Sequence, residues 1–321
     1  MFKKPLWAAA LASSVMIAGS ASAADTFTER YDGQKPAVSG LNGKLEFGYL
    51  YNEIEIAPGV SLDSDAFIAQ GAVSFPVMQH FGIQIDAGGF TGDIGGFDIS
   101  GAGIGGHVFW RDPDVALLGG YVHYVNTDIA GVIDLDNIRY GVEGEVYLNR
   151  WSIEGFIGAD YLKASVGPFS ADTTFFSGEA VAAVYPVDNL RIFAGVHHAF
   201  DRTSFIAGGE YLFNTGWQAE PALFARGAFA DDSSTVMAGL KFYFGESGKS
   251  LIRRHREDDP QINLFDNIGA AGSAACGTPP PMPPQKPVGN AIVASVEYEG
   301  PIMPSSICAG GAPMMPDPEY D

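Results

Sequence analysis

The chain has 321 residues, of which 18 are Lys or Arg and 38 are Asp or Glu, giving a formal net charge of −20. This acidity argues against a nucleic-acid-binding protein, because phosphate recognition requires a basic surface. Hydrophobic residues make up 46% of the chain and glycine occurs 41 times. Beyond the N-terminal region no apolar stretch is long enough for a transmembrane helix. The chain is therefore either a soluble acidic protein or a β-barrel whose apolar residues alternate with polar ones.

Residues 1–23 have the features of a secretory signal peptide. Lys3 and Lys4 give a positive start, residues 6–19 form a short apolar run, and an Ala-Ser-Ala motif ends at residue 23. We expect cleavage after this motif, so that the chain is secreted through the inner membrane. Residues 24–41 are polar and aperiodic, and we interpret them as an N-terminal lead-in to the folded part.

Residues 42–245 alternate between apolar and polar side chains with the period of a β-strand. The clearest example is residues 138–161, where two runs of about a dozen residues flank a tight turn at Asn149-Arg150. Such runs have nearly the length that a strand needs to cross a bilayer at a tilt. We predict twelve strands, whose apolar faces include residues 45–51, 67–75, 81–89, 102–110, 118–124, 138–148, 151–161, 176–184, 190–200, 205–213, 217–229 and 236–244.

Charged and aromatic residues distinguish the two faces of these strands. No Asp, Glu, Lys or Arg falls on the apolar face, and the aromatic residues of that face gather at the strand ends, such as Trp110 at one end and Tyr161 at the other. Two aromatic belts around an apolar band are typical of a barrel in lipid. We therefore predict that the apolar face meets lipid and that the charged face lines a lumen. The predicted lumen-lining residues are Asp86, Arg139, Glu143, Glu145, Glu154, Asp160, Arg191, Glu210, Glu220, Arg226 and Lys241.

The links between the predicted strands alternate in length. Short turns are expected near residues 77, 113, 150, 187 and 215, and longer links, richer in Asp and Gly, near residues 57, 95, 131, 167 and 232. The link near residue 202 is as short as a turn. This alternation is typical of outer-membrane barrels, which have short periplasmic turns and longer external loops.

The last predicted strand adds a motif to this pattern. Gly239, Phe242 and Phe244 stand where outer-membrane barrels present an assembly signal, with glycine first and alternate aromatic residues last. Residues 42–245 resemble Gram-negative outer-membrane β-barrel proteins, especially the small porin-like ones. The resemblance implies an all-β, antiparallel, up-and-down transmembrane barrel in the cell outer membrane. Its implied partners are outer-membrane lipid, lipopolysaccharide and the barrel-assembly machinery. In many such proteins the aromatic residue ends the chain, whereas here 77 residues follow Phe244.

Residues 246–321 are predicted to form a periplasmic, Pro-rich and largely disordered tail, because an even number of strands leaves both barrel ends on the periplasmic side. An alternative is that the basic residues 249–256 and the Pro-rich run 279–284 contact peptidoglycan or a periplasmic protein. Cys276 and Cys308 are a candidate disulfide in an oxidising compartment.

The sequence favours a porin-like passive channel for small hydrophilic solutes with a mild cation preference, since the predicted interior holds six basic and ten acidic residues. The alternative is a sealed barrel that anchors the tail to the cell wall or a partner, because twelve strands give a backbone radius of only roughly 12 Å. A lipid hydrolase is a minor alternative. His198 faces lipid near Thr203, but the triad expected of such an enzyme is not recognisable. We expect no enzymatic activity, cofactor or metal.

Overall fold

The structure is a computed structural model that describes residues 35–57, 60–258 and 260–266. The predicted signal peptide, residues 24–34 of the lead-in, and residues 267–321 with both cysteines lie outside the described residues. No helix among the described residues is long and apolar enough to span a membrane.

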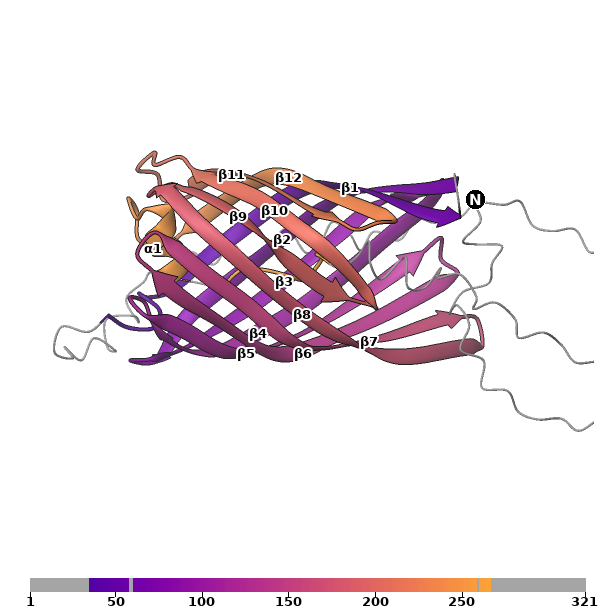
Figure 1. The fold of residues 1–321 in the computed structure, drawn as a ribbon, viewed down its shortest axis with the longest axis horizontal. Helices are drawn as coiled ribbons and strands as arrows, with labels where there is room; N and C mark the ends of the chain where they lie inside the picture. The colour runs from indigo at the N-terminus through magenta and orange to yellow at the C-terminus, as the bar shows by residue number, and fades with distance from the viewer. Residues whose placement is uncertain (1–34, 58–59, 259, 267–321) are drawn as a thin grey trace, which may run out of the picture. The chain divides into compact units, whose positions relative to one another are not determined.

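Twelve antiparallel strands form a closed barrel (Figure 1). Each strand pairs with its neighbours in sequence, and β1 pairs with β12 from Gly43–Phe244 to Ile54–Ser233, which closes the sheet. The predicted all-β up-and-down barrel of twelve strands is confirmed. The strands are β1 (Asn42–Ala57), β2 (Val60–Met78), β3 (Phe81–Ile94), β4 (Phe97–Asp112), β5 (Ala116–Ile129), β6 (Ile133–Leu148), β7 (Trp151–Val166), β8 (Phe169–Val187), β9 (Leu190–Ala199), β10 (Arg202–Leu212), β11 (Glu220–Phe229) and β12 (Ser233–Phe244).

The strands differ in length. β1 to β8 have 14 to 19 residues, whereas β9 to β12 have 10 to 12. We call the end of the barrel at which β1 begins and β12 ends the near end, and the opposite end the far end. The first eight strands therefore carry extra residues, which form a wall at the far end.

The predicted contrast between short turns and longer links is wrong. At the far end the strands are separated by two or three residues, such as 95–96 and 130–132, and the longest link, 213–219, lies at the near end. Gly95 and Gly96 have φ of 57° and 87°, the left-handed conformation that a two-residue hairpin requires. The Asp- and Gly-rich residues expected in loops instead continue the strands, because they keep the alternation of period 2.

The barrel wall has an apolar outside and a polar inside over most of its height. Ile104 and Ile157 point outward and are 56% and 60% exposed, while Asp86 and Arg111 point inward and are fully buried. This is the reverse of the arrangement in a soluble protein, where exposed side chains are mostly polar. It matches the pattern of a barrel surrounded by lipid.

The far-end parts of β1 to β8 have the opposite polarity. We call residues 52–55, 61–66, 91–100, 126–137 and 162–173 the collar. Here Asp98 and Asp134 are exposed on the outside, while Ile99 and Ile133 are buried on the inside. Most inward apolar side chains of the collar belong to one buried cluster inside the barrel, although Phe97 and Phe169 at the rim are exposed. The collar therefore has the outside and the core of a water-soluble barrel.

Candidate functional site: the lumen and its C-terminal segment

A short helix closes the near end of the barrel. Helix α1 (Leu251–Glu257) follows β12 and lies at the near end in Figure 1. The backbone N–H of Ile252 donates to the carbonyl of Asp188 at 3.0 Å, which fixes α1 to the β8–β9 link. Arg254 is 2% exposed and pairs with Glu220 at 2.7 Å, at the start of β11. A buried pair of this kind is costly to break, so it holds α1 against the barrel.

His255 of α1 is buried between two tyrosines of the wall. Its Nδ1 lies 2.9 Å from the Tyr185 hydroxyl and its Nε2 lies 3.0 Å from the Tyr243 hydroxyl. Burial lowers the pKa of His255, partly offset by a hydrogen bond with Glu210. A neutral imidazole accepts one of these hydrogen bonds and donates the other, so both ring nitrogens are satisfied.

The N-terminal lead-in covers the rest of the near end. The N–H of Ala37 donates to the carbonyl of Gln79 at 2.6 Å, and the N–H of Ser39 donates to the carbonyl of Glu257 at 2.8 Å. Val38 is fully buried in a cluster with Phe109 and Leu117. The lead-in and α1 thus pack together over the near end.

After α1 the chain turns into the barrel. The Asp258 carboxylate accepts hydrogen bonds from Ser39 Oγ and Lys249 Nζ, each at 2.7 Å, and its carbonyl accepts one from Ser74 Oγ at 3.1 Å. Lys44 of β1 donates to the carbonyl of Pro260. These contacts direct residues 260–266, which we call the lumen segment, away from the near end and into the lumen.

Apolar side chains of the lumen segment pack against the inner wall. Ile262, Leu264 and Phe265 are 2%, 2% and 1% exposed and belong to the buried cluster that also fills the collar. The ring of Phe265 lies 5.3 Å from the ring of Phe90, edge to face. The lumen segment is therefore part of the core inside the barrel.

Glycines on the inner face of β4 leave space for the lumen segment. A Cβ on Gly105 would stand 3.0 Å from Leu264, and one on Gly103 would stand 3.4 Å from Phe265. Both glycines point inward from β4, so larger side chains there would occupy the space that the segment fills. The glycine run in residues 101–106 thus has a packing role.

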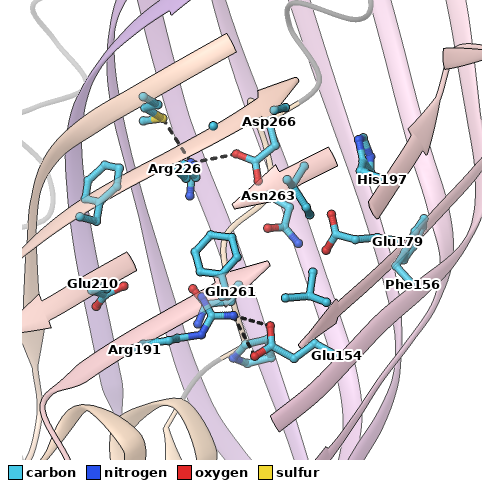
Figure 2. A pocket seen from close by; sticks show the side chains of 18 of the residues that line it. Glu154, Phe156, Glu179, Arg191, His197, Glu210, Arg226, Gln261, Asn263 and Asp266 are labelled. Atoms are coloured by element: carbon cyan, nitrogen blue, oxygen red, sulfur yellow. Dashed lines mark hydrogen bonds and ion pairs between the residues drawn. The ribbon is translucent and has the colours of Figure 1, made fainter. Parts of the chain in front are cut away.

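The segment ends in an ion pair. Asp266 Oδ1 lies 2.8 Å from the Arg226 guanidinium (Figure 2). The same guanidinium also contacts Glu46 at 3.1 Å. Arg226 belongs to β11, 40 residues before Asp266 in sequence. This pair joins the last described residue of the chain to the barrel wall.

All eleven side chains predicted to line the lumen point inward, and many pair around the wall. Close contacts between wall residues include Arg191–Glu154 at 2.6 Å, Lys241–Glu210 at 2.8 Å, and His107 with both Asp86 and Glu143 at 2.9 Å. Arg139 stacks over Phe156, Asp160 accepts a hydrogen bond from Asn137 at 3.5 Å, Glu145 lines a cavity, and Glu220 and Arg226 hold the C-terminal residues. The interior charges thus form a network across the lumen.

A cavity of about 140 Å³ remains beside the lumen segment (Figure 2). It is bounded by Gln261, Asn263 and Asp266 on one side and by charged wall residues on the other. It also reaches Ala228 and Thr235, which stand one and two residues from the far ends of β11 and β12. The lumen segment was not predicted from the sequence, whereas Glu46, Arg111 and Glu179 belong to the charged inner face that the alternation predicted. The narrow radius of a twelve-stranded barrel and the inward glycines of β4 are the sequence signals consistent with a filled lumen.

The other predicted sites lie on β12 at the seam of the barrel or beyond the described residues. Gly239 pairs with Gly48 across the β1–β12 seam, and the Phe242 ring lies 6.4 Å from Phe47, so these residues stand where the barrel closes. Phe244 is the last residue of β12. The candidate disulfide lies outside the described residues.

On the outer wall, His198 Nδ1 lies 2.8 Å from Thr203 Oγ1. Among the described residues, no group of three or more His, Cys, Asp and Glu side chains is arranged to hold a metal ion.

Solved structures share this architecture. The translocator domain of the autotransporter NalP from Neisseria meningitidis aligns with a TM-score of 0.54 at 13% identity, over 69% of this chain and 91% of that one. The β domain of the Bordetella autotransporter BrkA gives 0.44 at 12% identity, over 64% and 100%. An outer-membrane channel from Pseudomonas putida F1 gives 0.43 at 9% identity, over 66% and 98%. No family model and no curated protein matches the sequence. The chain has the fold of outer-membrane β-barrels.

Proposed function

We propose that this protein is a sealed barrel of the outer membrane, which holds its own C-terminal segment inside the lumen. The observation that carries the proposal is the placement of residues 260–266, which are buried against the inner wall and joined to it by the Asp266–Arg226 pair. A conducting pore needs a continuous aqueous path, and here apolar side chains and paired charges occupy the lumen.

Energetics support a stable seal. Burial of each large apolar side chain contributes roughly 1.5–3 kcal/mol, and Ile262, Leu264 and Phe265 are all buried. The lumen segment also stays connected to α1, whose buried Arg254–Glu220 pair resists removal. Withdrawal of the segment would expose its three apolar side chains and leave a void beside the inward glycines of β4.

The outward face supports the location. The apolar band of exposed side chains needs lipid around it, and the strand-based barrel satisfies its own backbone hydrogen bonds, as lipid requires. The acidic outside of the collar suits the aqueous and headgroup region above that band. We infer that lipopolysaccharide surrounds the collar and that the barrel-assembly machinery inserts the protein.

Planar-bilayer recording tests the seal. The full-length protein and a variant lacking residues 267–321 keep the lumen segment, and we expect both to be silent. A variant lacking residues 249–321 also loses α1 and the segment, and we expect it to conduct. Heat-modifiable mobility on gels verifies that each barrel is folded. Steady conductance of the folded full-length protein would contradict the proposal.

A porin-like channel with a mild cation preference is the second candidate. The cavity is lined by six carboxylates against four Lys or Arg side chains, a surplus of two negative charges. A negative lining concentrates cations. If the full-length protein conducts, the double variant Glu143→Gln with Glu145→Gln should lower its cation selectivity, measured as the reversal potential in a salt gradient.

A further inference from the structure

The lumen segment runs from the near end toward the far end. Pro260 is bound by Lys44, the third residue of β1 at the near end. Phe265 packs on Phe90, which lies in the far half of β3, and Asp266 pairs with Arg226, three residues before the far end of β11. Seven extended residues reach at most about 24 Å, and these contacts place the two ends of the segment in opposite halves of the barrel.

Helix α1 and the lead-in occupy the near end of the barrel. α1 and residues 37–39 lie across it, and their buried contacts with the wall include Leu251, Val38 and Arg254. Beside β1 to β8, the far part of the lumen is filled by the apolar cluster of the collar.

Asp266 borders the cavity beside the lumen segment. The cavity continues past Asp266 to Ile206, Ala228 and Thr235, in the far halves of β10, β11 and β12. These are short strands, so the wall is lowest there. Asp266, the last described residue, thus lies beside a cavity whose lining extends toward the far ends of β10 to β12.

We propose that the chain passes out of the barrel at the far end beside β10 to β12, so that residues 267–321 are presented on the membrane face opposite to α1. With the near end in the periplasm, as the even strand number implies, this face is the cell surface. The inference rests on the proposed function, in which the lumen segment stays in place. It differs from the sequence-based expectation of a periplasmic tail.

The sequence of the tail suits such a path. Residues 267–321 contain one basic residue, Lys286, and are rich in Gly, Ala and Pro. Small side chains need little width in a passage beside the lumen segment.

Thiol labelling tests the side on which the tail emerges. Cys276 and Cys308 are the two cysteines of the chain, and after mild reduction they react with a membrane-impermeant maleimide wherever they are accessible. Two position markers are made in a background with both cysteines changed to Ser. Asp201→Cys marks the far end, and Asp114→Cys marks the near end.

We expect the native cysteines to label in intact cells as fully as Asp201→Cys, whereas Asp114→Cys labels only after the cells are opened. Labelling of the native cysteines only in opened cells, as for Asp114→Cys, overturns the inference. A peptide tag fused after Asp321 and detected by antibody on intact cells gives a second readout, and absence of surface signal likewise counts against it.

Thiol labelling tests the far-end path and bilayer recording tests the seal, so their outcomes distinguish failure of one proposal from failure of the other. A silent full-length barrel whose cysteines label only in opened cells leaves the seal standing and removes the far-end path. A conducting full-length barrel with the same labelling removes both. Surface labelling of a folded but conducting barrel supports the path and removes the seal.

Discussion

On the outward side of β4, Ile104 is exposed in the middle of the strand and Asp98 is exposed near its far end. On the inward side the order is reversed, because the charged Arg111 is buried toward the near end and Ile99 is buried in the collar. The same strand thus has apolar side chains outside along most of its length, as in lipid, and polar side chains outside at its far end, as in water. The comparison shows that alternation fixes which side chains share a face, while the surroundings decide which face must be apolar.

The largest expected effect comes from placing a charge inside the collar. Ile133→Asp puts a carboxylate into the apolar cluster, where Ile133 is 1% exposed. An unpaired buried charge should destabilise the barrel by about 4 kcal/mol or more. Urea unfolding in detergent micelles, followed by tryptophan fluorescence, measures the loss. The neighbouring outward change Asp134→Asn serves as a control and should cost little, and equal losses would contradict the inverted polarity of the collar.

A charge on the outside should distinguish the lipid-facing band from the collar. Ile157→Arg places a cation on the apolar band, with an expected cost of about 2–4 kcal/mol if this position lies near the bilayer midplane. Val132→Arg adds the same side chain at the exposed far end of the collar, where about 0.5 kcal/mol or less is expected. Unfolding of both variants in lipid vesicles compares them. Similar costs would mean that the collar also lies in lipid.

Two adjacent glycines of β4 face opposite sides of the barrel wall, Gly105 the lumen and Gly106 the outer surface. Gly105→Leu pushes into Leu264 of the lumen segment, and overpacking of this kind costs about 1–3 kcal/mol. Gly106→Leu points outward, where a Cβ meets only the carbonyl of Gln84 at 3.5 Å. We expect faster proteolytic cleavage near residue 260 in the Gly105 variant alone. The same cleavage rate in both variants would mean that the segment does not occupy this space.

The smallest expected effect is a dependence of α1 docking on pH. Burial lowers the pKa of His255 in the folded state below its unfolded value of about 6.5. The stability due to neutral His255 is therefore present above that value and is lost as the pH falls through the folded pKa. The protection factors of the α1 amides, which are corrected for the intrinsic pH dependence of exchange, should fall as the pH is lowered from about 7.5 to 5. His255→Gln should remove this fall, and an unchanged pH profile in that variant would assign it to another group.

Much of the barrel could be predicted from the sequence because the period of 2 is a local property. The parity of Glu143, Glu145 and Glu154 was sufficient to place them on the inner wall, and the aromatic belts indicated which face meets lipid. The link lengths were mispredicted because Asp- and Gly-rich residues such as those around Asp98 and Asp134 were interpreted as loops. These residues also alternate, but their polar side chains point outward and their apolar side chains point inward. That inversion makes sense only when the collar is treated as a part of the barrel that lies in water.

The sequence by itself determined the strands, their number and the inward direction of the charged side chains, since each follows from neighbours a few residues apart. The tertiary structure decided what fills the lumen. Leu264 and Phe265 meet Gly105, Gly103 and Phe90 from more than 150 residues away, and Asp266 meets Arg226 from the opposite side. No local pattern encodes such contacts, because barrel closure brings these distant strands around one segment. That closure makes the lumen a packed core as well as the inner wall of a barrel.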